Sequence, residues 1–138
     1  MKSTIAELYL QESLKSFKGL KSNTEKAMEQ ISDSQFHEQP DEESNNVAII
    51  VKHMAGNMLS RFTDFLTSDG EKPDRNRDGE FQDTFSTRKD LLDYWEKGWT
   101  CLFNALHSLG PDDLEKIVLI RNEEHTVLRA LQRQLSHY

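Results

Sequence analysis

Cysteine, proline and long hydrophobic runs are all scarce in this chain of 138 residues, and each scarcity limits what the protein can be. The single cysteine, Cys101, has no partner for an intrachain disulfide, which fits a reducing compartment. The longest apolar run, residues 47–51, is far shorter than the ~20 residues that a membrane-spanning helix needs. The first residues also lack the apolar segment of a secretory signal. We therefore expect a cytoplasmic protein that does not cross a membrane.

Positive charge is also in the minority. The chain has 17 Lys and Arg residues against 24 Asp and Glu residues, which gives a net charge of −7. Nucleic acids and anionic membranes attract proteins of the opposite sign, so neither is an expected partner. The sequence contains no Gly-rich phosphate loop, nucleophile elbow, Cys cluster or zinc-protease motif. Its length and mean hydropathy of −0.74 predict one folded domain over residues 1–138.

The three prolines, Pro40, Pro73 and Pro111, lie in polar segments and divide the chain into four parts. Proline lacks a backbone donor and disfavours helix at the residue before it. Within each part, apolar residues recur every three or four positions, which is the period of a helix rather than that of a strand. The pattern predicts four helices, near residues 3–34, 46–67, 87–109 and 122–138. Residues 117–120, Ile-Val-Leu-Ile, form a β-branched run that also suits an extended segment.

Residues that favour helix ends agree with these bounds. Asn45 or Asn46 suits the N-cap of the second helix, Thr87 that of the third and Asn122 that of the fourth. The pair at 110–111, Gly-Pro, is a helix stop. Four amphipathic helices with short connections predict an all-α four-helix bundle, in which the fourth helix is the shortest.

The candidates for chemistry are the five histidines, which are His37, His53, His107, His125 and His137. His53 lies at the edge of the apolar stripe of the second predicted helix, with Asn57 one turn and Arg61 two turns further on. These polar side chains along a core-facing edge indicate either a site or a half-buried histidine with a local partner. His137 borders the apolar stripe of the fourth predicted helix. A bundle can bring two such histidines together, but two alone do not make a metal site, so unrelated surface histidines remain the alternative.

The other histidines are weaker candidates. His125 falls in the first turn of the fourth predicted helix and does not share a face with His137. His107 falls near the end of the third predicted helix, where a positive charge is favoured, and we expect it at the surface. His37 falls in a loop and receives no role.

The third predicted helix carries Trp95 and Trp99 one turn apart. Two tryptophans on one helix face are typical of a core or of a dimer interface. Because no base can be identified next to Cys101, we interpret this cysteine as a small buried apolar residue rather than a nucleophile.

Three stretches carry a resemblance to a known family. They are NVAIIVKHMAGNM at 46–58, TSDGEKP at 67–73, and a C-terminal stretch that begins EHTVL at 124 and ends QLSHY at 138. With them the chain resembles the DinB-like superfamily (DinB/YfiT-like metalloenzymes), and within it a subgroup catalogued as domain of unknown function 1572. The resemblance covers essentially the whole chain.

The resemblance implies a four-helix bundle of the up-down-down-up type, usually dimeric, with a three-histidine metal site. In the superfamily one histidine comes from the second helix and a His-x-x-x-His pair comes from the fourth. His53 matches the first ligand and His137 the first member of the pair. The second member would fall four residues after His137, and the chain ends at Tyr138. The resemblance therefore implies a fourth helix that is cut short, a domain incomplete at its C-terminus, and at most a weakly held metal.

Two functions follow as expectations. Characterised members of the superfamily include metal-dependent thiol S-transferases, which implies an enzyme that uses a divalent metal (Ni, Zn or Fe), a low-molecular-weight thiol and a small electrophile. Asn57, Arg61 and His125 would then surround the metal or the substrate, with the rings of His53 and His137 facing one another inside the bundle. The alternative is a non-catalytic helical interaction or stress-response protein. Because a short fourth helix leaves apolar stripes uncovered, either protein is expected to form a homodimer.

Overall fold

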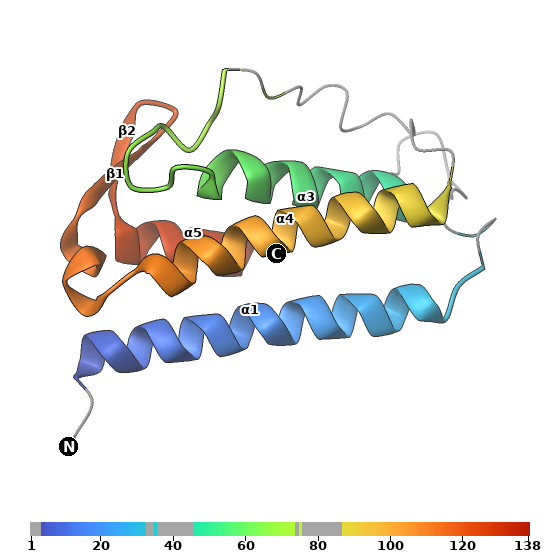
Figure 1. The fold of residues 1–138 in the computed structure, drawn as a ribbon, viewed down its shortest axis with the longest axis horizontal. Helices are drawn as coiled ribbons and strands as arrows, with labels where there is room; N and C mark the ends of the chain where they lie inside the picture. Colours follow the sequence, from blue (N-terminus) through green and yellow to red (C-terminus); the bar gives the residue numbers. More distant parts are fainter. Residues whose placement is uncertain (1–3, 33–34, 36–45, 74, 76–86) are drawn as a thin grey trace.

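Four α-helices make up most of the computed structural model, in which residues 4–32, 35, 46–73, 75 and 87–138 are described (Figure 1). They are α1 (Ile5–Glu29), α3 (Val47–Phe62), α4 (Arg88–Ser108) and α5 (Val127–His137). A 3-10 helix, η2 (Pro111–Glu115), and a hairpin of β1 (Ile117–Ile120) and β2 (Glu123–Thr126) connect α4 to α5. In Figure 1, α1 and α5 run in one direction, and α3 and α4 run in the other.

The helix starts follow from side-chain caps. Asn46 Oδ1 accepts a hydrogen bond from the backbone N–H of Ile49 at 2.7 Å, and Thr87 Oγ1 accepts one from Asp90 at 3.1 Å. The predicted caps Asn46 and Thr87 are thus confirmed, and the alternative Asn45 lies outside the described residues, as does His37. The second helix ends five residues earlier than predicted, because Asp64 takes a positive φ of 49°. The first helix likewise ends early, at Glu29.

The predicted fourth helix is wrong over its first residues, whereas the predicted all-α class agrees broadly with a structure that is mostly helical and has one small two-stranded sheet. Residues 123–126 form β2, which pairs antiparallel with β1, and Arg121 and Asn122 form the tight turn with φ values of 52° and 65°. Val118 and Ile120 on β1 point into the core, which accounts for the β-branched run. Thr126, not Asn122, is the N-cap of α5, so His125 lies on a strand rather than on a helix.

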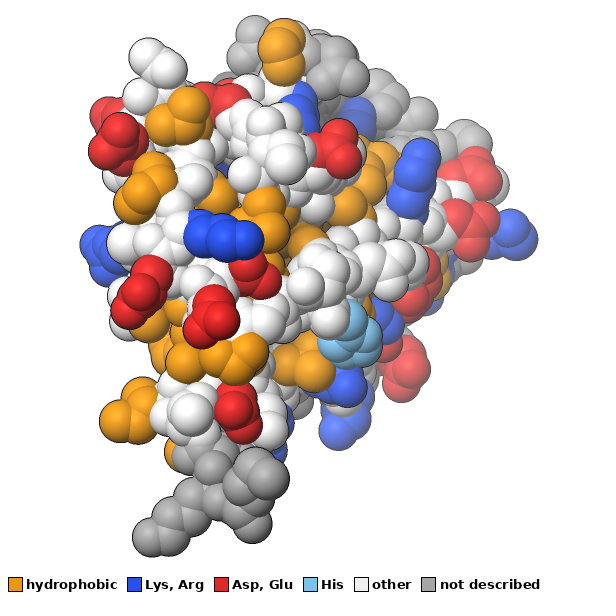
Figure 2. Space-filling view, turned by 60° about the vertical axis from the view of Figure 1, so that its left-hand side comes forward, with side chains coloured by type: hydrophobic (Ala, Val, Ile, Leu, Met, Phe, Trp, Pro, Cys, Tyr) orange, Lys and Arg blue, Asp and Glu red, His pale blue; other side chains and the backbone are white. Residues whose placement is uncertain are grey.

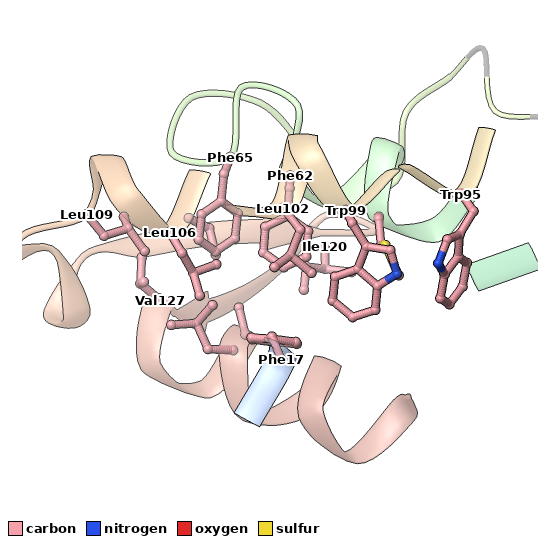
Figure 3. Close-up of a cluster of buried hydrophobic side chains, with 14 of the residues drawn as sticks. Phe17, Phe62, Phe65, Trp95, Trp99, Leu102, Leu106, Leu109, Ile120 and Val127 are labelled. Atoms are coloured by element: carbon pink, nitrogen blue, oxygen red, sulfur yellow. The ribbon is translucent and has the colours of Figure 1, made fainter. Parts of the chain in front are cut away.

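The core is built around two tryptophans of α4 (Figure 3). Trp95 and Trp99 are both fully buried, and their ring centres lie 5.6 Å apart. Phe17 of α1 meets Trp99 edge-on, with ring centres 6.4 Å apart. Trp95 donates a hydrogen bond from its indole N–H to Glu25 at 3.3 Å. Both tryptophans therefore belong to the core of the single chain, whereas Cys101 is half-buried rather than buried.

The α3–α4 contact depends on two small residues. A Cβ atom added to Gly98 of α4 would lie 3.0 Å from the Cα and 3.1 Å from the carbonyl oxygen of Ala55 on α3. The two backbones therefore meet so closely that a side chain at position 98 would be crowded by the backbone of α3. Gly19 on α1 is different, because an added Cβ there would meet no atom within 4 Å.

The end of the molecule that carries the start of α1 and the hairpin exposes several large hydrophobic side chains, scattered among charged ones (Figure 2). Ile5 of α1 is 87% exposed and Ile117 of β1 is 52% exposed. In the part of the chain that the structure describes, no helix combines the length and the apolar character needed to cross a membrane.

Gly98 on α4 and Gly19 on α1 provide a matched pair of stability tests. We expect Gly98→Ala to lower the free energy of unfolding by about 1–3 kcal/mol, because the methyl group forces the two backbones apart. Gly19→Ala should raise it by about 0.5–1 kcal/mol through helix propensity alone. Urea unfolding followed by circular dichroism measures both. A Gly98→Ala protein as stable as the parent would contradict the close approach of α3 and α4.

Candidate functional site

A cavity of about 410 Å³ opens between α3, the turn of the hairpin and α5. Two histidines and four arginines line it, namely His53, His137, Arg61, Arg121, Arg129 and Arg133. Asn57, Gln134 and Ser136 complete the polar part of its wall. The cavity therefore gathers nitrogen-bearing side chains from segments that lie far apart in the sequence.

The structure brings His53 and His137 together. Their ring centres lie 5.8 Å apart and their planes are inclined by 68°. His53 is half-buried on α3, and His137, the last residue of α5, is exposed where the cavity meets the solvent. The expected pairing of the two rings is thus present, although it lies at the mouth of a cavity and not inside the bundle.

The surroundings of His137 favour its neutral form. Burial of part of the ring lowers the pKa of His137, and the positive charges of His53, Arg61, Arg75 and Arg133 lower it further. A neutral imidazole keeps the lone pair with which it can accept a proton or bind a metal ion.

Asn57 is held by the residue after α5. The Tyr138 hydroxyl donates a hydrogen bond to Asn57 Oδ1 at 2.6 Å. The Tyr138 ring packs edge-on against Phe17 and Trp99, with ring centres 6.3 and 6.1 Å away, and its burial raises the pKa of the phenol. This contact fixes the end of α5, and with it His137, against α3.

Arg61 lines the cavity as expected, but its charge is partly neutralised. Its guanidinium donates to the carbonyl oxygen of Gly70 at 2.5 Å and to Glu71 at 2.8 Å. Glu71 also pairs with Arg75 at 3.3 Å and lies 3.9 Å from Arg121. One carboxylate therefore faces three guanidinium groups, and the region keeps an excess of positive charge.

The loop of residues 69–72 attaches the hairpin to α3. The Asp69 carboxylate accepts hydrogen bonds from the backbone N–H groups of Glu71 (2.7 Å), Arg121 (2.9 Å) and Asn122 (2.7 Å). The N–H of Gly70 donates to Leu119 of β1 at 2.7 Å. A Cβ at Gly70 would lie 3.0 Å from Arg61 Cδ, so any larger residue here would crowd the Arg61 side chain. These contacts hold Arg121 at the cavity.

His125 acts on the cavity through another residue. Arg133 donates to His125 Nε2 at 2.6 Å, which leaves Nδ1 as the protonated nitrogen that donates to the Glu123 carbonyl oxygen at 3.1 Å. His125 is therefore not part of the cavity wall, but it orients an arginine that is. His107, by contrast, is exposed on the last turn of α4, as predicted.

Arg129, Arg133 and Gln134 line the cavity but were not predicted from the sequence. A signal was available, since Arg129, Arg133 and His137 follow one another at intervals of four residues and so share one face of α5. Arg121 offered no such signal, because its position depends on the hairpin turn.

As a metal site the arrangement offers two ligands. Among the described residues, no group of three or more His, Cys, Asp or Glu side chains is placed to hold a metal ion. With metal–nitrogen bonds of about 2 Å, two imidazoles that share a metal ion lie with their ring centres roughly 5 Å apart. The observed 5.8 Å is somewhat longer than that separation, and the pair could supply at most two coordination positions.

We expect Asp69→Asn to lower the free energy of unfolding at pH 7 by about 1–2 kcal/mol, because charge-assisted hydrogen bonds to the hairpin turn are lost. Backbone hydrogen bonds, chiefly that from Glu71, lower the pKa of Asp69 below its ordinary value of 3.8. The carboxylate thus stabilises the fold above that value, and the contribution is lost as the pH falls through the lowered pKa.

Chemical denaturation of both proteins at several pH values measures this effect. The difference between Asp69→Asn and the parent should shrink in acid, whereas Asp93→Asn, in an exposed pair with Lys89, should change stability little at any pH. A difference that stays constant with pH would contradict the role of the Asp69 charge.

Comparisons with known proteins place the chain in a family. A family model described as "Protein of unknown function (DUF1572)" matches residues 4–138, a range that includes the helices and strands described above and both cavity histidines. No curated protein and no solved structure is significantly similar to the chain. Because the match extends over nearly the whole sequence, the chain belongs to the DUF1572 family of proteins of unknown function.

Proposed function

We propose that the cavity is the active site of a divalent-metal-dependent enzyme of the DinB-like superfamily, which transfers a low-molecular-weight thiol to a small electrophile. The observation that carries the proposal is the pairing of His53 and His137 at 5.8 Å on the wall of this cavity. These are the two histidines that the resemblance assigns as metal ligands. The directions of the four helices agree with the up-down-down-up bundle of that superfamily (Figure 1).

The residues of the chain have separate tasks in this proposal. His53 and His137 would hold the cation through neutral imidazoles, and Ni, Zn and Fe all accept such ligands. Asn57, fixed by Tyr138, faces the same space. When bound, the cation would lower the pKa of a thiol and keep it as the nucleophilic thiolate.

The arginines support thiol chemistry on their own. A thiolate is favoured over a thiol by nearby positive charge, and four guanidinium groups line the cavity. The cavity volume of about 410 Å³ suits a small substrate together with a small thiol.

We expect the chain as given to bind a divalent metal weakly, because it supplies two protein ligands. A variant continued by helix-forming residues, with a histidine four residues after His137, should bind one equivalent of Ni²⁺ or Zn²⁺. In that variant His53→Ala should abolish stoichiometric binding, and His107→Ala, which changes an exposed histidine on α4, should not. Titration calorimetry and elemental analysis measure both. The metal proposal fails if the extended protein binds no metal, or if His53→Ala binds it as well as the extended parent.

The second candidate is a dimeric helical interaction protein without catalysis, and the exposed hydrophobic side chains favour it. Four large hydrophobic side chains on α1 and β1 are exposed, namely Ile5, Leu8, Ile117 and Leu119. The start of α1 and the hairpin lie at the same end of the molecule (Figure 1). A contiguous apolar patch often marks a protein interface, and these side chains are scattered among charged ones, so they support this candidate less than the cavity supports the first.

A homodimer is compatible with both candidates and is tested directly. We expect light scattering at micromolar concentrations to give twice the chain mass of 16.0 kDa. Ile117→Lys, which places a charge on the exposed face of β1, should shift the protein toward the monomer without loss of helical signal. A monomer for the parent protein at all concentrations would contradict the dimer.

A further inference from the structure

We infer that this cavity binds a small organic anion that also carries a hydrogen-bond donor. Arg129 and Arg133 would hold its carboxylate or phosphate group, and its hydroxyl or amino group would donate a hydrogen bond to Gln134. As an identification of the substrate class, this inference rests on the proposed function. As a binding site it does not require the metal.

The charge distribution is the first support. The chain carries a net charge of −7, yet four of its seven arginines line one cavity. Among the described residues that form the wall, none is acidic. A planar guanidinium matches the oxygen pairs of carboxylates and phosphates, so a cluster of arginines in a hollow is suited to an anion.

The four arginines differ in their availability. Arg61 donates to Glu71, and Arg121 lies 3.9 Å from the same carboxylate. Arg133 is hydrogen-bonded to the ring of His125, which orients it while leaving its charge intact. Within the described part of the chain, the Arg129 guanidinium has no hydrogen-bond or ion-pair partner. The two available guanidinium groups therefore both come from α5.

Their spacing defines what they can hold. Arg129 and Arg133 are four residues apart, so they stand one turn apart on the same face of α5. Two guanidinium groups in this arrangement can grip one tetrahedral phosphate or the two ends of a short dicarboxylate. His137 lies one turn further along the same face, which places the anion beside the histidine pair.

Gln134 supplies an independent observation. Its side chain lines the cavity, the residue is only 5% exposed, and its amide oxygen has no hydrogen-bond partner in the structure. A buried oxygen without a partner is unfavourable, and native proteins rarely keep one. The arginines donate hydrogen bonds and suit the anionic part of a ligand, but none of them donates to Gln134 Oε1 in the structure, so a donor group of the ligand can do so. A ligand with an anionic group and a hydroxyl or amino group satisfies both.

The test uses calorimetry on the chain as given, treated with chelator to remove metal, at constant ionic strength. The probes are glutarate, 2-hydroxyglutarate and inorganic phosphate. We expect 2-hydroxyglutarate to bind with one-to-one stoichiometry and about tenfold more tightly than glutarate, because only it has a hydroxyl for Gln134. Inorganic phosphate distinguishes a carboxylate site from a phosphate site. If phosphate binds more tightly than either dicarboxylate, the site is assigned to phosphate esters. Failure of all three probes to bind at millimolar concentration would overturn the inference.

Three variants locate the site. Arg129→Gln and Arg133→Gln should each weaken binding about tenfold or more. Lys18→Gln makes the same charge change at an exposed position on α1 outside the cavity wall and should have little effect. Gln134→Leu should remove the preference for 2-hydroxyglutarate over glutarate while the protein remains folded, since it replaces an unpartnered oxygen. If Lys18→Gln weakens binding as much as Arg129→Gln does, binding depends only on the overall charge of the protein, and the inference is overturned.

The two proposals fail separately. Anion binding without metal binding in the extended variant would overturn the proposed enzyme and leave the anion site intact. Metal binding in the extended variant without anion binding would overturn this inference alone.

Discussion

The attachment of residues 69–72 to both α3 and the hairpin is the constraint on which the rest of the structure depends. The Asp69 carboxylate fixes the hairpin turn, and the carbonyl oxygen of Gly70 accepts hydrogen bonds from Ser60 and Arg61 near the end of α3. Because α5 starts directly after the hairpin, this loop sets where α5 lies relative to α3. The cavity between them, and the approach of His53 to His137, follow from that placement.

Much of the helical architecture could be predicted from the sequence, and its failures have physical causes. The caps Asn46 and Thr87 and the glycine–proline stop at 110–111 are local signals, and the structure confirms them. The hairpin was missed because Glu123–Thr126 is polar and becomes a strand only by pairing with β1. Such pairing depends on a partner strand and on the Asp69 contacts, and neither can be deduced from local periodicity.

The residues of the candidate site also fall into those that local sequence signals indicate and those that only long-range contacts place. His53 and His137 could be found from the resemblance and from helix faces, and Asn57 and Arg61 from their spacing to His53. The role of His125 could not, because it depends on a strand that was expected to be helix. Arg121 reaches the cavity only through the turn that Asp69 holds. Residues on regular helices were thus predictable, and residues placed by long-range contacts were not.

The contact between the two ends of the chain has a consequence for folding. The Tyr9 hydroxyl donates to the carbonyl oxygen of Leu128 at 3.2 Å, and the Tyr138 ring rests on Phe17. During synthesis on a ribosome, α1 emerges well before α4 and α5, the helices against which it packs. Contacts of such long sequence separation slow folding, because a large loop must close before they form. A nascent chain therefore exposes the apolar face of α1 until α4 and α5 have both emerged, and that interval is when a chaperone would recognise it.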